Sequence, residues 1–201
     1  PSWTLIKTSL TREKACTLNN YIELLSQKST YTVLVNSLFV SLLGSVGATV
    51  IGVLIAWLLA RTDVPGKRFW QTFLIVPYLI PPFIGAIAWV YLLGPVGYLN
   101  KIWMAISGSL APLFVIYGKW GIVFVMAIYS YPIAYMVNLG PFRQMNPSLE
   151  EAARISGASM TRTLRDIVLP LMAPSIGGSF LLIFMSMMAN FGIPAVIGFP
   201  E

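Results

Sequence analysis

Charge is scarce in this chain of 201 residues: only 10% of the residues are charged, whereas 57% are hydrophobic. Soluble domains carry roughly 25% charged residues, so the composition indicates a membrane protein. Histidine is absent and Cys16 is the single cysteine, which excludes a disulfide within the chain and a cluster of thiolate ligands for a metal. The sequence also lacks a Gly-rich phosphate loop ending in Lys-Ser or Lys-Thr. We therefore expect no catalytic residue, no metal site and no bound cofactor.

Four stretches contain no charged residue at all, namely 29–60, 69–100, 120–142 and 171–190. About 20 apolar residues cross the hydrocarbon core of a bilayer, so we expect four transmembrane helices and an all-α membrane protein. Residues 1–28 are more polar and predict a lead-in segment outside the membrane, with one or two helical turns near residues 20–25. Residues 98–118 predict a short interfacial helix followed by a loop.

Prolines interrupt the second charge-free stretch at Pro77, Pro81 and Pro82. We expect the helix to kink or partly unwind there, and unwound backbone in a membrane needs hydrogen-bond partners from protein or water. Residues 77–85 therefore fit two interpretations, the wall of a cavity and a simple proline kink.

Five residues in the spans or at their ends are candidates for a substrate path: Asn36, Pro81, Pro82, Tyr131 and Asn190. Asn36 also fits an interfacial residue or a hydrogen bond between helices. Tyr131 also fits a packing residue whose hydroxyl finds a neighbouring acceptor.

The long polar run at residues 143–170 lies between two apolar stretches. Asn146 is a suitable N-cap, and Pro147 fits the first helical position, where no N–H is needed. Glu150 and Glu151 fall in the first turns, where the helix dipole favours negative charge. This part of the run predicts a short helix.

The same run predicts a second helix after a sharp turn. Gly157 suits the left-handed residue that ends a helix, and the next helix is expected to start near Ser159. Arg162 and Asp166 can form an ion pair at four-residue spacing. Residues 143–170 therefore predict a charged helical hairpin at the membrane surface.

The spacing within this hairpin also resembles the EAA signature of binding-protein-dependent ABC importer permeases. The matching positions are Glu151, Ala152, Ala153, Gly157, Ile167, Leu169 and Pro170. In that family the loop is cytoplasmic and holds a coupling helix that docks in a cleft on the ATP-hydrolysing subunit. The resemblance implies a type I importer fold, ATP bound by that partner, and structural roles for Ile167, Leu169 and Pro170. It implies that the following residues contact the ATPase: Glu150, Glu151, Ala152, Ala153, Arg154, Gly157 and Ala158.

Three further segments, 56–66, 81–89 and 190–195, resemble the fused permeases of ferric iron, thiamine, phosphonate and polyamine importers. The segment Asn190 to Ala195 is most similar to ferric iron permeases. The resemblance implies a permease domain over residues 29–201, a second permease half, a periplasmic or lipid-anchored solute-binding protein, and ferric iron as the substrate. Thiamine, phosphonate and polyamine remain as alternatives. A membrane scaffold or enzyme with a docking hairpin is the alternative from another class.

The distribution of basic residues predicts an orientation in a bacterial inner membrane. With the hairpin inside, the cytoplasmic loops hold Arg61, Lys67, Arg68, Arg143, Arg154, Arg162 and Arg165, and the external loop holds Lys101 and Lys119. This asymmetry obeys the positive-inside rule. The basic lead-in segment 1–28 would be extracytoplasmic, against the rule, and a helix upstream would explain it. We therefore expect a piece of a longer protein that lacks its first and last helices. Because the basic residues lie in loops beside apolar stretches, no nucleic-acid partner is expected.

Overall fold

The computed structural model describes residues 4, 9, 11–12, 15–16 and 19–198 and divides into two compact units, residues 1–39 and 40–201. In the first unit, β1 (Thr11–Arg12) pairs antiparallel with β2 (Ala15–Cys16). The helix α2 (Asn19–Ser26) confirms the helical turns expected near residues 20–25. The Asn20 side chain donates to the Ser9 carbonyl at 3.0 Å.

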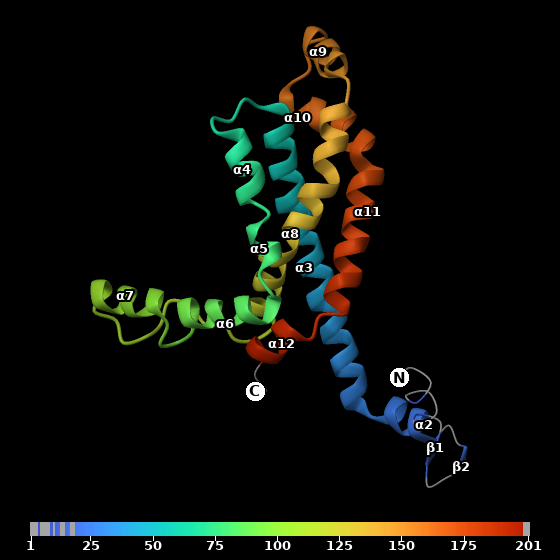
Figure 1. Cartoon of the computed structure of the whole chain (residues 1–201), viewed down its shortest axis with the longest axis vertical. Coiled ribbons are helices and arrows are strands. Elements are labelled where there is room, and N and C mark those ends of the chain that lie inside the picture. The colour runs from blue at the N-terminus through green and yellow to red at the C-terminus, as the bar shows by residue number, and fades with distance from the viewer. Residues whose placement is uncertain (1–3, 5–8, 10, 13–14, 17–18, 199–201) are drawn as a thin grey trace. The chain divides into compact units, whose positions relative to one another are not determined.

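The elements assigned in the second unit are all helices (Figure 1). The first of them is the part of α3 (Lys28–Arg61) that follows residue 39. The others are α4 (Lys67–Phe73), α5 (Val76–Leu79), α6 (Pro82–Leu93), α7 (Tyr98–Ser107), α8 (Lys119–Gln144), α9 (Pro147–Ile155), α10 (Met160–Thr163), the π-helix η1 (Leu164–Val168), α11 (Leu169–Met188) and α12 (Gly192–Ile197).

Three long helices, α3, α8 and α11, form the core of this unit. Small residues let α3 approach α8 closely: a methyl group added at Gly52 would overlap the Tyr131 carbonyl oxygen and lie 2.6 Å from the Ala134 methyl. Between α8 and α11, Asn138 is fully buried and donates to the Ser179 hydroxyl at 2.9 Å. Close backbone packing and a buried amide therefore join the three helices.

By length and composition, four helical segments could cross a membrane: Lys28–Arg61, Pro82–Ser107, Lys119–Gln144 and Met160–Met188. The break expected at the prolines of residues 69–100 is confirmed, because this stretch is divided into α4, α5 and α6. The candidate span, however, begins at Pro82 rather than at residue 69. The second of the four segments joins α6 to α7 across a turn at residues 94–97. The fourth begins at Met160 rather than near 171, since α10, η1 and α11 follow one another without a gap.

The two ends of the second unit carry different elements (Figure 1). The hairpin helices α9 and α10 lie at one end, together with the last turn of α3 and the start of α4. At the other end, α6, α7 and α12 lie near the start of α8. The helix α7 confirms the expected short helix after residue 98, and the buried Asn100 joins it to the following loop by accepting from the Leu113 and Phe114 amides at 2.9 and 3.0 Å.

Candidate functional site

The first helix of the hairpin is capped as its sequence predicts. The Asn146 side chain accepts a hydrogen bond from the Ser148 amide at 3.1 Å, and Pro147 occupies the first turn. Glu150 also lies in the first turn, where its negative charge is favoured by the helix dipole. Local sequence is therefore enough to start α9 at this point.

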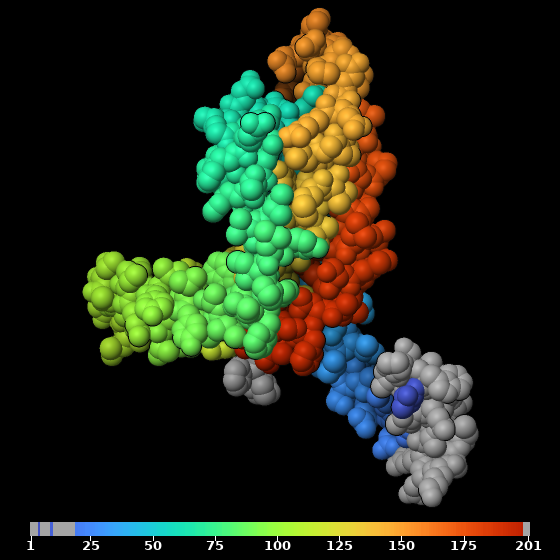
Figure 2. Space-filling model, viewed as in Figure 1, coloured from blue at the N-terminus to red at the C-terminus, as the bar shows by residue number. Residues whose placement is uncertain are grey.

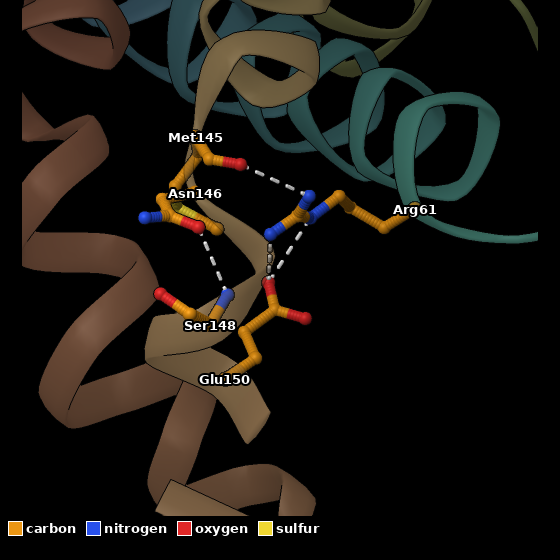
Figure 3. A network of polar contacts seen from close by, with 5 residues as sticks. All are labelled: Arg61, Met145, Asn146, Ser148 and Glu150. Atoms are coloured by element: carbon orange, nitrogen blue, oxygen red, sulfur yellow. Dashed lines mark hydrogen bonds and ion pairs between the residues drawn. The ribbon is translucent and has the colours of Figure 1, made fainter. Parts of the chain in front are cut away.

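An ion pair fixes this helix to the end of α3 (Figure 3). Both Nε and Nη2 of Arg61 donate to one oxygen of Glu150, at 3.0 and 2.8 Å, while Nη1 donates to the Met145 carbonyl at 3.2 Å. The Arg61 and Glu150 side chains are 11% and 17% exposed, so solvent screens this pair less than it screens a surface pair. The Glu150 carboxylate is thus directed at Arg61.

The end of α9 also follows the prediction. Gly157 has a φ of 78°, the left-handed conformation that L-residues with a side chain rarely adopt. Its amide donates to the Arg154 carbonyl, and the Ala158 amide donates to the Ala153 carbonyl, both at 3.0 Å. This pair of bonds is a Schellman motif, which satisfies the last carbonyls of the helix.

The second arm of the hairpin continues directly into the membrane helix α11. The Ser159 hydroxyl caps α10 by accepting from the Arg162 amide at 3.3 Å. The wide turn of η1 follows, closed by a bond from the Leu169 amide to the Leu164 carbonyl, and it ends just before Pro170. Of the three predicted structural residues, Ile167 lies in η1, while Leu169 and Pro170 begin α11.

The structure distinguishes two groups among the seven residues expected to dock. Glu151, Ala152, Arg154 and Gly157 are exposed, whereas Glu150, Ala153 and Ala158 are half-buried. Between the hairpin and α3, a pocket of about 130 Å³ is lined by Trp57, Glu150, Arg154, Ala158, Met160, Thr163, Leu164 and Val168. Ile155, at the tip, is 88% exposed and is the most exposed large apolar residue of α9. The hairpin therefore presents a partly apolar outer face. Figure 2 shows the hairpin at one end of the second unit.

A larger cavity, of about 310 Å³, lies between the α5–α6 break, α8 and α11. Neutral polar side chains and thioethers share its wall with apolar groups. The lining residues are Tyr78, Ile80, Pro82, Met126, Tyr129, Ser130, Ile133, Ser186, Met187, Asn190 and Ile193. Of the two interpretations of residues 77–85, the structure therefore favours a cavity wall.

The five candidates for a substrate path are not all brought together. Pro82 and Asn190 line the cavity, and the Asn190 side chain also accepts from the Ile193 amide at 3.2 Å. Pro81 is exposed and precedes α6, whereas Asn36 belongs to the first unit. Tyr131 is outside the cavity lining, and its hydroxyl donates to the Leu74 carbonyl at 2.9 Å.

Sequence reasoning missed two features of these sites. Arg61 was counted only as a basic loop residue, although its side chain organises the base of the hairpin. Ser130 and Ser186 were not singled out as cavity residues. Serines in charge-free helices, at the level of a proline break, are the sequence feature that could have indicated the cavity. The Arg61–Glu150 pair joins residues 89 positions apart, so no local sequence pattern indicates it.

Residues 48–200 match the family described as binding-protein-dependent transport system inner membrane component. This chain belongs to that family. The matched region includes the hairpin and the cavity. Members of the family are ABC importer permeases rather than enzymes, so this chain is a multi-pass membrane permease component.

Two curated relatives illustrate the range of the family. The ferric transport system permease protein FbpB of Actinobacillus pleuropneumoniae is 29% identical over 177 residues, which cover 88% of this chain and 26% of FbpB. The spermidine/putrescine transport system permease protein PotB of Salmonella typhimurium is 28% identical over 207 residues, covering 98% of this chain and 71% of PotB. The permease chain described here thus spans about a quarter of the length of its ferric relative.

A solved structure shares the fold. A bacterial ABC transporter involved in the import of the acidic polysaccharide alginate superposes with a TM-score of 0.77 at 20% identity. The superposition covers 99% of this permease chain and 72% of the alginate transporter chain. The helical arrangement of an importer permease is therefore confirmed for this chain.

Proposed function

We propose that this chain forms part of the translocation path of a ferric iron importer in a bacterial inner membrane and couples to a separate ATPase subunit through the hairpin at residues 143–170. A solute-binding protein delivers the substrate at the opposite face, and a second permease half completes the path. The observation that carries the proposal is the EAA-like hairpin, with its outer face exposed and its base fixed to α3 by the Arg61–Glu150 pair.

The geometry of the hairpin supports a docking role. Ala152 and Glu151 are exposed on α9 next to the exposed Ile155, so a small and partly apolar surface faces outward. Arg61 holds the base of the helix, and a fixed base lets force on the outer face act on α3. The wide turn η1 connects the other arm to α11, so both arms lead into membrane helices.

Variants of exposed hairpin residues test this role in the complete transporter. Ala152→Trp should block close approach of the ATPase, and Glu151→Lys should weaken docking by reversing a charge near a helix start. Both variants should insert normally but co-purify less ATPase and lose ATP-driven uptake. Val96→Trp, at a residue that is 79% exposed at the opposite end, is the matched control. Full ATPase binding and uptake in both hairpin variants would contradict a coupling role.

The cavity of about 310 Å³ supports a place on the substrate path. It contains the predicted residues Pro82 and Asn190 and lies within the helical bundle, where neutral polar groups are costly unless they are used or paired. Ser130→Trp should fill it, and we expect uptake to fall while ATPase binding is retained.

Ferric iron is favoured over the other substrates by the segment Asn190 to Ala195 and by the match to a ferric transport permease over 88% of the chain. The polyamine relative matches to a similar degree, so uptake measurements decide between them. Deletion of the gene should abolish binding-protein-dependent uptake of radioactive ferric iron. Normal iron uptake together with loss of polyamine or thiamine uptake would contradict the iron assignment and retain the importer role.

The orientation is tested with single cysteines in a Cys16→Ser background. Asp63→Cys, in the exposed α3–α4 loop, should react only with reagents that enter the cytoplasm. Val96→Cys, in the exposed α6–α7 turn, should react with an impermeant external reagent. The opposite labelling pattern would overturn both the orientation and the coupling role.

A further inference from the structure

The break between α4 and α5 changes the backbone hydrogen bonds around it. In a continuous α-helix, each carbonyl accepts from the amide four residues later. Here the Ile75 amide donates to Thr72 at 3.2 Å instead of to Gln71, and the Tyr78 amide donates to Ile75 at 3.0 Å instead of to Leu74. The carbonyls of Gln71 and Leu74 therefore lose their helical donors.

Two phenol groups of α8 supply the missing donors. The Tyr131 hydroxyl donates to the Leu74 carbonyl at 2.9 Å, and the Tyr135 hydroxyl donates to the Gln71 carbonyl at 3.4 Å. The two tyrosines are four residues apart and so lie on one face of α8. They are 8% and 1% exposed, so both side chains are buried against the broken segment. A partly buried carbonyl without a donor is costly, which explains why phenols rather than phenylalanine rings suit these positions.

These contacts lie directly beside the cavity. Tyr129 and Ser130, which immediately precede Tyr131 on α8, line it from one side. Tyr78 and Ile80, which follow the break, line it from another. The Tyr131 bond is therefore within about one helical turn of cavity residues on both of the segments that it joins. The Tyr135 bond is equally close on α8, where Ile133 lines the cavity, but its acceptor Gln71 lies about two turns before Tyr78.

We propose that Tyr131 and Tyr135 are positioning residues of the transport path, because their hydroxyls hold the broken α4–α5 segment against α8 and so set the opening of the cavity. The inference rests on the proposed function, in which the cavity is part of that path. Releasing these two bonds lets α5 shift relative to α8 without breaking a hydrogen bond inside either helix.

A cysteine reporter in the complete transporter measures the position of the wall. Ile80→Cys is placed in a Cys16→Ser background, because Ile80 lines the cavity, and its rate of modification by a small water-soluble thiol reagent is recorded. Tyr131→Phe should raise that rate about 3-fold, and at most about 20-fold, as expected when one hydrogen bond between membrane helices is lost. Tyr135→Phe should have a smaller effect because its bond is longer, and the double variant the largest.

Tyr91→Phe is the matched control, since it makes the same chemical change at a side chain on α6 that is 65% exposed. A merely structural role would lower the melting temperature of Tyr131→Phe without raising the labelling rate above that of Tyr91→Phe. An unchanged labelling rate in the double variant, in protein that retains ATPase binding, would overturn the proposal.

The ratio of solute uptake to ATP hydrolysis tests whether the position of the α4–α5 segment affects transport. Tyr131→Phe and the double variant should lower this ratio, because a loosely held wall lets the cycle turn over without moving solute. Raised labelling with an unchanged ratio would overturn the positioning role in transport. Normal uptake by Ser130→Trp would instead contradict the proposed function, because the cavity would then not belong to the substrate path. The labelling result for the tyrosine variants would still stand.

Discussion

The hairpin and the three-helix core of this permease are built in opposite ways. The shape of the hairpin is set by neighbours in sequence, namely the Asn146 cap, the left-handed Gly157 and the Ser159 cap, and one ion pair holds its base. The core depends on contacts between distant residues, such as Gly52 against the backbone of α8. Variants should therefore affect docking in the first region and stability in the second.

The largest effect is expected in the core. A methyl group at Gly52 would overlap the Tyr131 carbonyl and lie 2.7 Å from the Tyr135 amide nitrogen, and neither backbone atom can move freely. Gly52→Ala should therefore destabilise the complete transporter by about 1–3 kcal/mol, despite the better helix propensity of alanine. The melting temperature in detergent measures this loss.

The control for this prediction is Gly140→Ala in α8, where an added methyl group meets nothing within 4 Å. Alanine in a helix is favoured over glycine by roughly 0.5–1 kcal/mol, so this variant should be neutral or slightly stabilising. Equal melting temperatures for the two variants would mean that close α3–α8 packing does not stabilise the core.

The next largest effect is expected where the two regions meet. Arg61→Gln removes the partner of a Glu150 carboxylate that is 17% exposed, which should weaken the anchoring of the hairpin by about 1–3 kcal/mol. Co-purification of the ATPase should fall while the melting temperature of the core changes little. A double-mutant cycle with Glu150→Gln isolates the coupling between the two side chains. Zero coupling would show that Arg61 acts only through the Met145 carbonyl.

A smaller effect is expected at the turn of the hairpin. Gly157 has a φ of 78° but nothing within 4 Å of an added methyl group, so a substitution there causes backbone strain alone. Gly157→Val should destabilise the hairpin turn by roughly 1–2 kcal/mol and lower the affinity for the ATPase. Gly157→Asn should retain most of that affinity, because asparagine tolerates the left-handed conformation. Similar affinities for the two variants, measured by titration of the ATPase, would argue against a left-handed requirement.

The sequence predicted features that depend on neighbouring residues better than features that depend on distant ones. The caps at Asn146 and Ser159 and the turn at Gly157 were predictable because side chain and backbone interact within a few residues. The break within residues 69–100 was predictable from its prolines, but the bounds of α4, α5 and α6 were not, because hydropathy reports that a segment is apolar and not where each helix ends.

The candidate sites show the same limit. The hydrogen bond of Tyr131 could not be predicted, because its acceptor, the Leu74 carbonyl, lies 57 residues away and lacks its helical donor only as a result of the break. The Arg61–Glu150 pair is equally non-local, so neither contact has a periodic signal in the sequence. The docking residues of the hairpin, in contrast, were predicted from the resemblance of its local sequence to the EAA signature.

The smallest effect is expected on the outer face of the second arm. Arg162 and Asp166 form the predicted pair at 3.5 Å, but their side chains are 75% and 54% exposed. Such pairs at four-residue spacing contribute about 0.3–0.5 kcal/mol at most, and salt screens them. Arg162→Gln should therefore leave the melting temperature and the membrane insertion unchanged. If this variant nevertheless lowers ATPase co-purification as strongly as Arg61→Gln does, then Arg162 contacts the partner directly, and the docking surface extends from α9 onto α10.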